Sequence, residues 1–134
     1  MTANLKQSVP FFGVKNIEAS VRFYVEGLGF VLSKTWKPNG KLQWCLLERD
    51  DVALMLQEFL PSHVPAEKVG VGISICIICK DAIALYHEYK GRNVDATRPF
   101  VGNGLWVTTI IDPDGYRLEF ESLTDVPEDT VYSD

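Results

Sequence analysis

The stretch Asp112-Pro113-Asp114-Gly115-Tyr116-Arg117-Leu118-Glu119-Phe120-Glu121 is the most informative part of this 134-residue chain. Its first four residues predict a tight turn, because proline fixes one φ and glycine admits the positive φ that closes the bend. The alternating polar and apolar residues that follow predict a strand, so the whole stretch indicates a hairpin. Side chains two apart on a strand share a face, which places Glu119 and Glu121 together. They are candidate site residues if that face lines a cavity, and ordinary surface charges if it is solvated.

The composition is that of one ordinary globular domain. The length lies near the commonest domain size, and a hydrophobic fraction of 46% is enough for a core. No apolar run is long enough to span a membrane, and the N-terminus lacks the residue order of a secretion signal. The net charge of -5 disfavours nucleic acid as a partner, since phosphate contacts need a basic surface. We therefore expect a cytoplasmic protein with neither a nucleic-acid nor a membrane partner.

The three cysteines predict free thiols, because the chain shows no secretion signal. Cys76 and Cys79 have the C-x-x-C spacing of redox motifs, but they lie in a β-branched run that predicts a strand. Residues three apart on a strand point to opposite faces, so these two thiols cannot form a disulfide with each other. We interpret both as packing residues.

The chain consists of two halves with the same order of elements, within a single domain spanning 1–134. A proline-containing linker at about 60–70 separates module one, about 7–59, from module two, about 71–122. An acidic tail, 123–134, is expected to be mobile or to lie on the surface. The predicted strands are 7–14, 30–36, 42–48 and 52–58 in module one, and 72–79, 94–98, 105–111 and 116–122 in module two. A helix capped by Asn16 or Asp81 follows the first strand of each module.

The two modules can be laid over each other residue by residue. In this alignment Val9 falls on Ser74, Trp44 on Trp106, Leu54 on Leu118 and Met55 on Glu119. The repeated order of strand, helix and three strands is stronger evidence for an internal repeat than any single matched pair.

These segments resemble the vicinal oxygen chelate superfamily, which includes glyoxalase I, extradiol dioxygenases and bleomycin-resistance proteins. The resemblance rests on residues 13–17, 23–30, 53–58 and 112–119, and it covers nearly all of residues 7–122. It implies an α+β fold in which two βαβββ modules form an open, cupped β-barrel of the glyoxalase/bleomycin-resistance type. It also implies a concave ligand-binding face and a homodimer. One such scaffold hosts several chemistries, so the resemblance alone does not fix the function.

Metal-using members of that superfamily bind the ion with histidine and glutamate from the first and last strands of each module. Carried over by alignment, those positions are Val9, Met55, Ser74 and Glu119. Only the glutamate suits a hard or borderline metal ion. The two histidines do not lie on these strands, since His63 is in the linker and His87 is in the second helix. We therefore expect no bound metal and no other cofactor.

The concave face implied by this alignment is mostly apolar, with aromatic side chains and a few polar groups. The residues predicted to line it are Phe11, Trp44, Met55, Gln57, Ser74, Cys76, Trp106, Glu119 and Glu121. The pattern leaves open which face of the sheet the two tryptophans occupy, and they could equally pack inside the protein or at a dimer interface. Such a lining suits a small organic ligand that has a flat or apolar body and one polar or cationic group.

Glu119 is the only candidate catalytic residue. Facing an apolar cup, its carboxylate could bind a ligand cation, act as a base, or pair with Arg98 or Arg117. The preferred hypothesis is a metal-independent binding protein, similar to bleomycin-resistance proteins, for a cationic or aromatic antibiotic or metabolite. The alternative is a lyase, isomerase or dioxygenase of the superfamily that uses Glu119 with an unidentified metal site or as an acid-base group. A third hypothesis is a protein that binds an ordinary metabolite for sensing or transport.

Overall fold

The computed structural model describes residues 2–134 and shows an α+β fold of two βαβββ modules. Module one contains β1 (Phe11–Val14), α1 (Ile17–Arg22), the π-helical turn η1 (Phe23–Gly27), β2 (Val31–Trp36), the short turn η2 (Pro38–Gly40), β3 (Trp44–Arg49) and β4 (Val52–Glu58). Module two follows the turn η3 (Pro61–His63) and contains β5 (Ser74–Ile78), α2 (Ala82–Gly91), β6 (Phe100–Gly102), β7 (Leu105–Ile111) and β8 (Arg117–Leu123).

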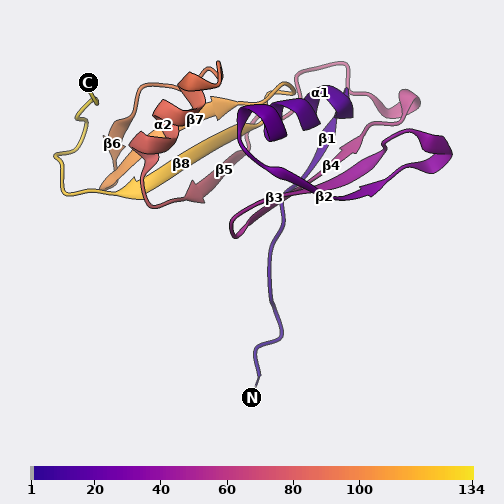
Figure 1. Cartoon of the computed structure of the whole chain (residues 1–134), viewed down its shortest axis with the longest axis horizontal. Helices are drawn as coiled ribbons and strands as arrows, with labels where there is room; N and C mark the ends of the chain where they lie inside the picture. Colours follow the sequence, from indigo (N-terminus) through magenta and orange to yellow (C-terminus); the bar gives the residue numbers. More distant parts are fainter. Residues whose placement is uncertain (1) are drawn as a thin grey trace.

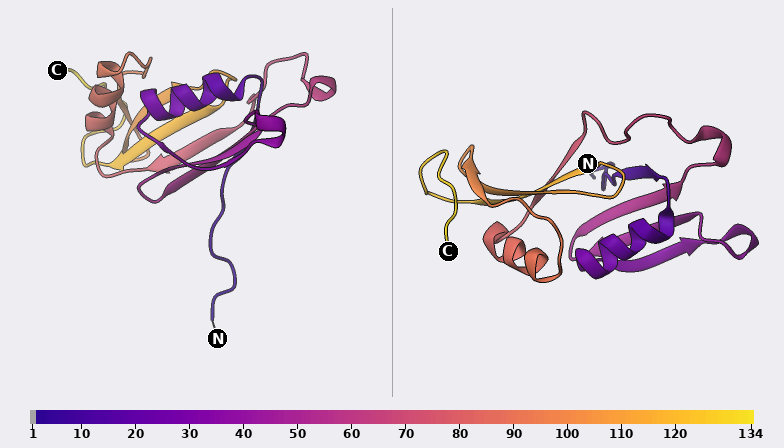
Figure 2. Two further views of the ribbon diagram at one scale, coloured as in Figure 1. Left: turned by 45° about the vertical axis from the view of Figure 1, so that its right-hand side comes forward. Right: turned by 90° about the horizontal axis from the view of Figure 1, so that it is seen from above.

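Each module forms its own four-stranded sheet. The strand order is β1-β4-β3-β2 in sheet A and β5-β8-β7-β6 in sheet B, and in each sheet the first and last strands of the module pair in parallel. The two sheets lie next to each other, and residues 2–134 do not close into a barrel (Figure 1). The helices α1 and α2 run side by side along one side of the pair of sheets (Figure 2).

The predicted helix caps are confirmed. The Asn16 side chain accepts a hydrogen bond from the Ala19 backbone N–H at 3.1 Å, and Asp81 accepts one from Ala84 at 2.9 Å. The two helices end differently, because the Phe30 backbone N–H reaches the Tyr24 carbonyl whereas Val94 reaches that of Tyr89. Module one therefore has one more residue at this point, and the wide π-helical turn accommodates it.

Strand alternation divides each sheet into a buried face and an open face. Leu54 and Leu56 of β4, and Leu118 and Phe120 of β8, are at most 3% exposed and pack beneath the helices. The residues between them on the same strands are half-buried and lie on the opposite face. We call these the open face of sheet A and the open face of sheet B.

Two predicted strands are wrong in their bounds. The first strand begins at Phe11 instead of residue 7, and residues 2–8 form an exposed arm that leaves the body of the protein (Figure 1). Residues 94–98 form no strand and make only an isolated bridge, Ala96 to Ile110. The second strand of module two is instead β6, in the predicted loop, because Asn103 and Gly104 both have positive φ (54° and 74°) and close a β6–β7 hairpin.

The outer strands of the two sheets have different surroundings. All six residues of β2 are exposed, and its pairing with β3 shifts between Leu32 and Lys34. In contrast, the acidic tail lies along β6, where the Val101 backbone N–H donates to the Thr130 carbonyl at 2.9 Å. This part of the tail is held by backbone hydrogen bonds.

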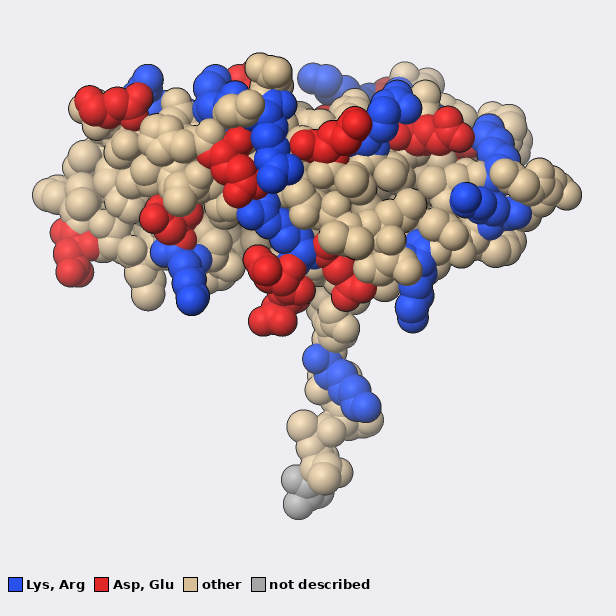
Figure 3. Space-filling view, viewed as in Figure 1, with Lys and Arg blue, Asp and Glu red and all other residues tan. Residues whose placement is uncertain are grey.

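The surface carries acidic and basic side chains interspersed with each other, as the face in Figure 3 shows. Across residues 2–134, every helix is too short or too polar to cross a bilayer.

The modules touch through two equivalent junctions. At the first, which we call the closed junction, the β7–β8 turn packs against the start of module one. The rings of Phe12 and Tyr116 stack with centroids 4.0 Å apart, and the Tyr24 hydroxyl donates to Asp112 at 2.8 Å. Gly115 has a φ of 94°, as its turn requires, and any Cβ there would approach the Val69 carbonyl oxygen to 2.7 Å.

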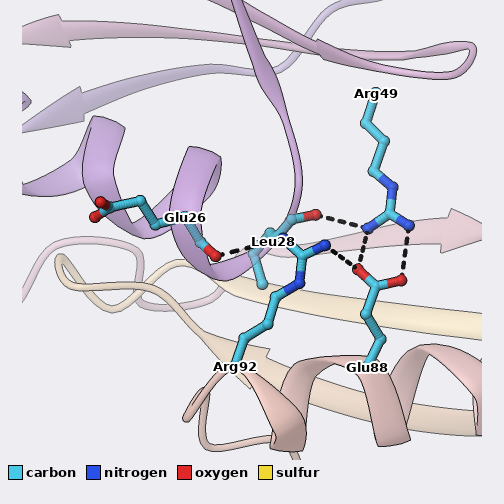
Figure 4. A network of polar contacts seen from close by, with 5 residues as sticks. All are labelled: Glu26, Leu28, Arg49, Glu88 and Arg92. Carbon is cyan, nitrogen blue, oxygen red and sulfur yellow. Dashed lines mark hydrogen bonds and ion pairs between the residues drawn. The ribbon is translucent and has the colours of Figure 1, made fainter.

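At the second, which we call the open junction, the β3–β4 turn lies near α2. Arg49 donates to both carboxylate oxygens of Glu88, at 2.8 and 3.0 Å, and to the Leu28 carbonyl at 2.7 Å. Arg92 joins the same carboxylate at 3.3 Å and also reaches the Glu26 carbonyl (Figure 4). Here a partly exposed ionic network connects the modules.

Candidate functional site

The open face of sheet A brings together the residues predicted from module one. The parallel pairing of β1 with β4 places Phe11 beside Met55, and the antiparallel pairing of β3 with β4 places Trp44 beside Gln57. Phe11 is 54% exposed and the other three are half-buried. The face is therefore an apolar and aromatic surface that is accessible to a ligand.

Sequence reasoning missed one aromatic member of this face. Trp36, the last residue of β2, lies directly opposite Trp44 and is 55% exposed. Residues paired across strands point to the same side, so the two indoles form one edge of the open face of sheet A. The signal that could have identified it is the hairpin itself. β2 ends at Trp36 and β3 begins at Trp44 after the turn, so the two residues face each other across the pair of strands.

The open face of sheet B is polar and acidic. Cys76 is paired with Glu119 and Ile78 with Glu121 across β5 and β8, and Ser74 is paired with Arg117. All these residues are exposed or half-buried. The predicted residues of module two are thus also brought together, with the exception of Trp106.

Trp106 is a correction to the predicted lining. It is paired with Ser122, whose hydroxyl accepts a hydrogen bond from the Ala82 backbone N–H under α2, and it contacts Tyr132 edge-on at 6.0 Å. It therefore lies on the buried side of sheet B. The residue of module two that corresponds to Trp44 is Val107, because Trp44 is paired with Gln57 and Val107 with Glu121. A shift of one residue reverses the face.

Glu119 is paired with a protein cation. The Arg117 Nε donates to its carboxylate at 3.0 Å, and the Cys76 thiol lies 3.6 Å from its other oxygen. Arg98, the other predicted partner, instead donates to the Tyr132 carbonyl at 3.1 Å. The Arg117 and Glu119 side chains are 49% and 21% exposed, so their ion pair is worth little to stability and a ligand could displace it.

The donors at the four metal positions of the superfamily do not fit a hard or borderline ion. Val9 has no donor and precedes β1, while Met55 and Ser74 offer a thioether and a hydroxyl. A different set, Cys76, Glu119 and Glu121, has ligand atoms that all lie within 4.8 Å of one another. Burial raises the pKa of the Cys76 thiol and the carboxylates of Glu121 and Glu119 raise it further, which disfavours the thiolate that a metal ion would need.

Neither of the two hollows found among residues 2–134 joins the open faces. The cavity of about 740 Å³ at the open junction includes only Ile78 of the residues named above on these faces, and the hollow of about 380 Å³ near the start of α1 includes none of them. A ligand that touched both open faces of a single chain would therefore have to bridge two separate surfaces.

Comparisons with known proteins agree with this architecture. The family described as the Glyoxalase/Bleomycin resistance protein/Dioxygenase superfamily matches residues 8–120. No curated protein matches the chain by sequence.

Among solved structures, the chain is similar to a bleomycin resistance determinant encoded on the transposon Tn5, with TM-score 0.72 and 19% identity over 91% of this chain and 100% of the other. A bleomycin-binding protein complexed with bleomycin gives 0.71 and 20%, covering 88% and 98%. TnmS3, an antibiotic binding protein from Streptomyces sp. CB03234, gives 0.67 and 21%, covering 91% and 100%. At these identities the structures establish a shared fold.

The family match spans most of the chain, and both the βαβββ repeat and the sheet order agree with it. The chain therefore belongs to the glyoxalase/bleomycin resistance protein/dioxygenase superfamily.

Proposed function

We propose that this protein is a metal-independent binding protein for a small organic molecule with an aromatic or apolar body and a cationic group. The ligand could be an antibiotic or a metabolite of that class. The similarity to bleomycin-resistance and antibiotic-binding proteins supports the antibiotic. The three free cysteines support a reducing, cytoplasmic location.

The observation that carries the proposal is the chemical contrast between the two open faces. Phe11, Trp36 and Trp44 make the face of sheet A aromatic, and Glu119 and Glu121 make the face of sheet B acidic. Aromatic faces bind flat and cationic groups, and carboxylates neutralise a cation. One ligand of the proposed class satisfies both surfaces.

We propose further that a homodimer completes the site by placing the open face of sheet A of one copy against the open face of sheet B of the other. Phe11, Trp36 and Ile78, all on the open faces, are more than half exposed in the single chain. Apolar surface of this kind commonly marks an interaction site. Sedimentation of the purified protein should show a dimer, and a monomer at all concentrations would contradict this arrangement.

Metal independence is tested by elemental analysis of the purified protein. We expect no stoichiometric iron, manganese, nickel or zinc, because the four family positions lack donors. Near-stoichiometric metal that disappears in Glu119→Ala would refute the proposal and favour the enzyme hypothesis, with the Cys76, Glu119 and Glu121 set as its ligands.

Ligand class is tested by thermal shift with bleomycin-type glycopeptides and with aromatic amines. A ligand at a hundred times its Kd stabilises the folded state by about 2.7 kcal/mol, which raises the Tm by a few degrees. Trp44→Ala and Glu121→Gln should each reduce the shift, whereas Trp106→Ala, on the other side of its sheet, is the matched control and should retain it. A shift that Trp106→Ala abolishes and Trp44→Ala retains would contradict the assigned faces.

A further inference from the structure

The cavity at the open junction is a separate feature from the two open faces. Its volume is about 740 Å³, and its walls come from both modules, with Phe30 and Val52 from module one and Ile77, Tyr89 and Phe120 from module two. The side chains of Ile77 and Phe120 lie on the helix side of sheet B, since they alternate with Cys76 and Glu119. The volume is within the range of small-molecule sites.

The cavity exists because two aromatic rings are missing. Ile77 occupies the position in module two that Phe12 has in module one, since their neighbours Phe120 and Leu56 correspond on the last strands. Ala53 corresponds to Arg117, since each is the residue of the last strand in the pair next to the hairpin turn. Val52 and Tyr116 directly precede them, so Val52 occupies the position of Tyr116. At the closed junction the two rings stack and fill the space, while two smaller aliphatic side chains leave it open.

A tyrosine hydroxyl on the cavity wall has no hydrogen-bond partner within residues 2–134. Tyr89 is 1% exposed overall, but in the same part of the chain no fully buried side-chain oxygen or nitrogen lacks a partner, so this hydroxyl reaches the space of the cavity. Its counterpart Tyr24 donates to Asp112, whereas the position of Asp112 is held here by Arg49, which cannot accept. The Tyr89 hydroxyl is therefore free to bond a polar group of a ligand that enters the cavity.

The rim of the cavity is acidic. Asp50 and Asp51 of the β3–β4 turn and Asp81 at the start of α2 stand there with Lys80. Arg49 and Glu88 also line it but neutralise each other through their paired hydrogen bonds. Three carboxylates against one ammonium group favour a cation at the entrance.

We propose that this cavity is a second ligand site, for a small aromatic amine. The ring fills the space that Phe12 and Tyr116 fill at the closed junction, a polar atom on the ring bonds the Tyr89 hydroxyl, and the ammonium group lies among the rim carboxylates. Ile78 is the one residue named above on the open faces that also lines the cavity, so the site uses none of the aromatic and acidic side chains proposed to bind the other ligand.

The test is an isothermal titration of the full chain with three probes. Tyramine has the ring, the phenol oxygen and the ammonium group, phenethylamine lacks the phenol oxygen, and 4-hydroxyphenylacetate replaces the ammonium group with a carboxylate. We expect tyramine to bind most tightly and the carboxylate to bind most weakly. Absence of heat from tyramine at millimolar concentration would overturn the proposal.

The decisive variant copies the closed junction into the open one. The double variant Val52→Tyr, Ile77→Phe should fill the cavity. It should weaken the binding of tyramine by at least about tenfold, which corresponds to a loss of about 1.4 kcal/mol in binding free energy. Val131→Ala, an exposed position in the acidic tail that lines neither the cavity nor an open face, is the control and should bind tyramine as the wild type does. A folded double variant that binds tyramine with unchanged affinity would show that the probe binds elsewhere.

Tyr89→Phe provides the second readout and does not depend on the double variant folding. It should weaken the binding of tyramine about fivefold, as expected for one neutral hydrogen bond of about 1 kcal/mol, and leave the affinity for phenethylamine unchanged. An equal loss for both amines, or none for tyramine, would overturn the role of the hydroxyl and with it the proposed site.

Discussion

At the closed junction Phe12 and Tyr116 stack, whereas at the open junction Ile77 and Val52 occupy the equivalent positions around a cavity of about 740 Å³. Both junctions join the same elements, a first strand and its helix in one module to the last turn of the other. The difference teaches that the repeat fixes the backbone of an interface while a few side chains decide whether it is packed or hollow.

The polar contacts are also more deeply buried at the closed junction than at the open junction. Asp112 is 4% exposed, accepts a hydrogen bond from Tyr24, and also accepts from the backbone N–H groups of Asp114 and Tyr116. Arg49 and Glu88 keep side-chain exposures of 27% and 30%. A buried, fully hydrogen-bonded carboxylate is costly to disturb, and a half-exposed ion pair is not. The closed junction therefore fixes the placement of the modules.

The largest expected difference is in the apolar contacts. Phe12→Ala removes a buried, stacked ring and should lower the free energy of unfolding by about 3–5 kcal/mol. Ile77→Ala at the equivalent position should cost clearly less, because its side chain already borders a cavity. Urea denaturation of both variants measures this. Equal losses would show that the two junctions carry similar packing energy.

The next difference is between the two tyrosines. Tyr24→Phe leaves the buried Asp112 carboxylate without a donor and should cost about 1–3 kcal/mol. Tyr89→Phe removes a hydroxyl that has no partner among residues 2–134 and should change stability by less than about 0.5 kcal/mol. Chemical denaturation in the absence of added amines makes the comparison, and a larger loss at Tyr89 would reverse our interpretation.

The ionic network at the open junction should contribute about 1 kcal/mol or less, because it is partly exposed. The hydrogen bonds from Arg49 hold the pKa of Glu88 below its ordinary value. A carboxyl whose pKa is lowered on folding contributes stability above its unfolded pKa and loses it as the pH falls through the folded value. The stability difference between wild type and Glu88→Gln should therefore be constant near neutral pH and vanish on acidification. A difference that is independent of pH would contradict this.

The smallest effect concerns Asp112. Burial raises the pKa of its carboxyl, despite the hydrogen bond from Tyr24, which lowers it. A raised pKa means that the folded state binds the proton more tightly, so this contribution is fully present below the unfolded pKa and is lost as the pH rises through the folded value. The stability of wild type relative to Asp112→Asn should thus decline as the pH rises from acid to neutral. Denaturation of both proteins across that range measures it, and the opposite slope would mean that the hydrogen bonds outweigh burial.

The residues that could be predicted from sequence act locally. Asn16 and Asp81 cap their helices and Gly115 closes its turn, since each needs only its neighbours in the chain. Trp106 was misplaced because matching it to Trp44 requires two extra residues before Leu118, whereas the second hairpin turn is longer by only one. Residues 49–52 lie between the pair Glu48–Ala53, and residues 112–116 between Ile111–Arg117. Spacing alone does not show where such an extra residue falls.

The sequence predicts which residues belong to the candidate site better than it predicts how they are arranged. Alternation placed Met55, Gln57, Glu119 and Glu121 on the open faces, but the partner of Glu119 depends on side-chain packing across strands. The cavity could not be foreseen, because it results from the absence of rings at Val52 and Ile77, and only the spatial overlay of the modules identifies those positions.

The outer strands of the two sheets have a consequence for self-association. An unpaired strand edge is a template on which further chains can add and grow into fibres. On β2, a charged Lys34 at the irregular pairing with β3 opposes such growth, and on β6 the acidic tail already occupies the edge through Thr130. The last residues of the chain thus protect it against aggregation, and a chain shortened before Asp129 would expose the β6 edge.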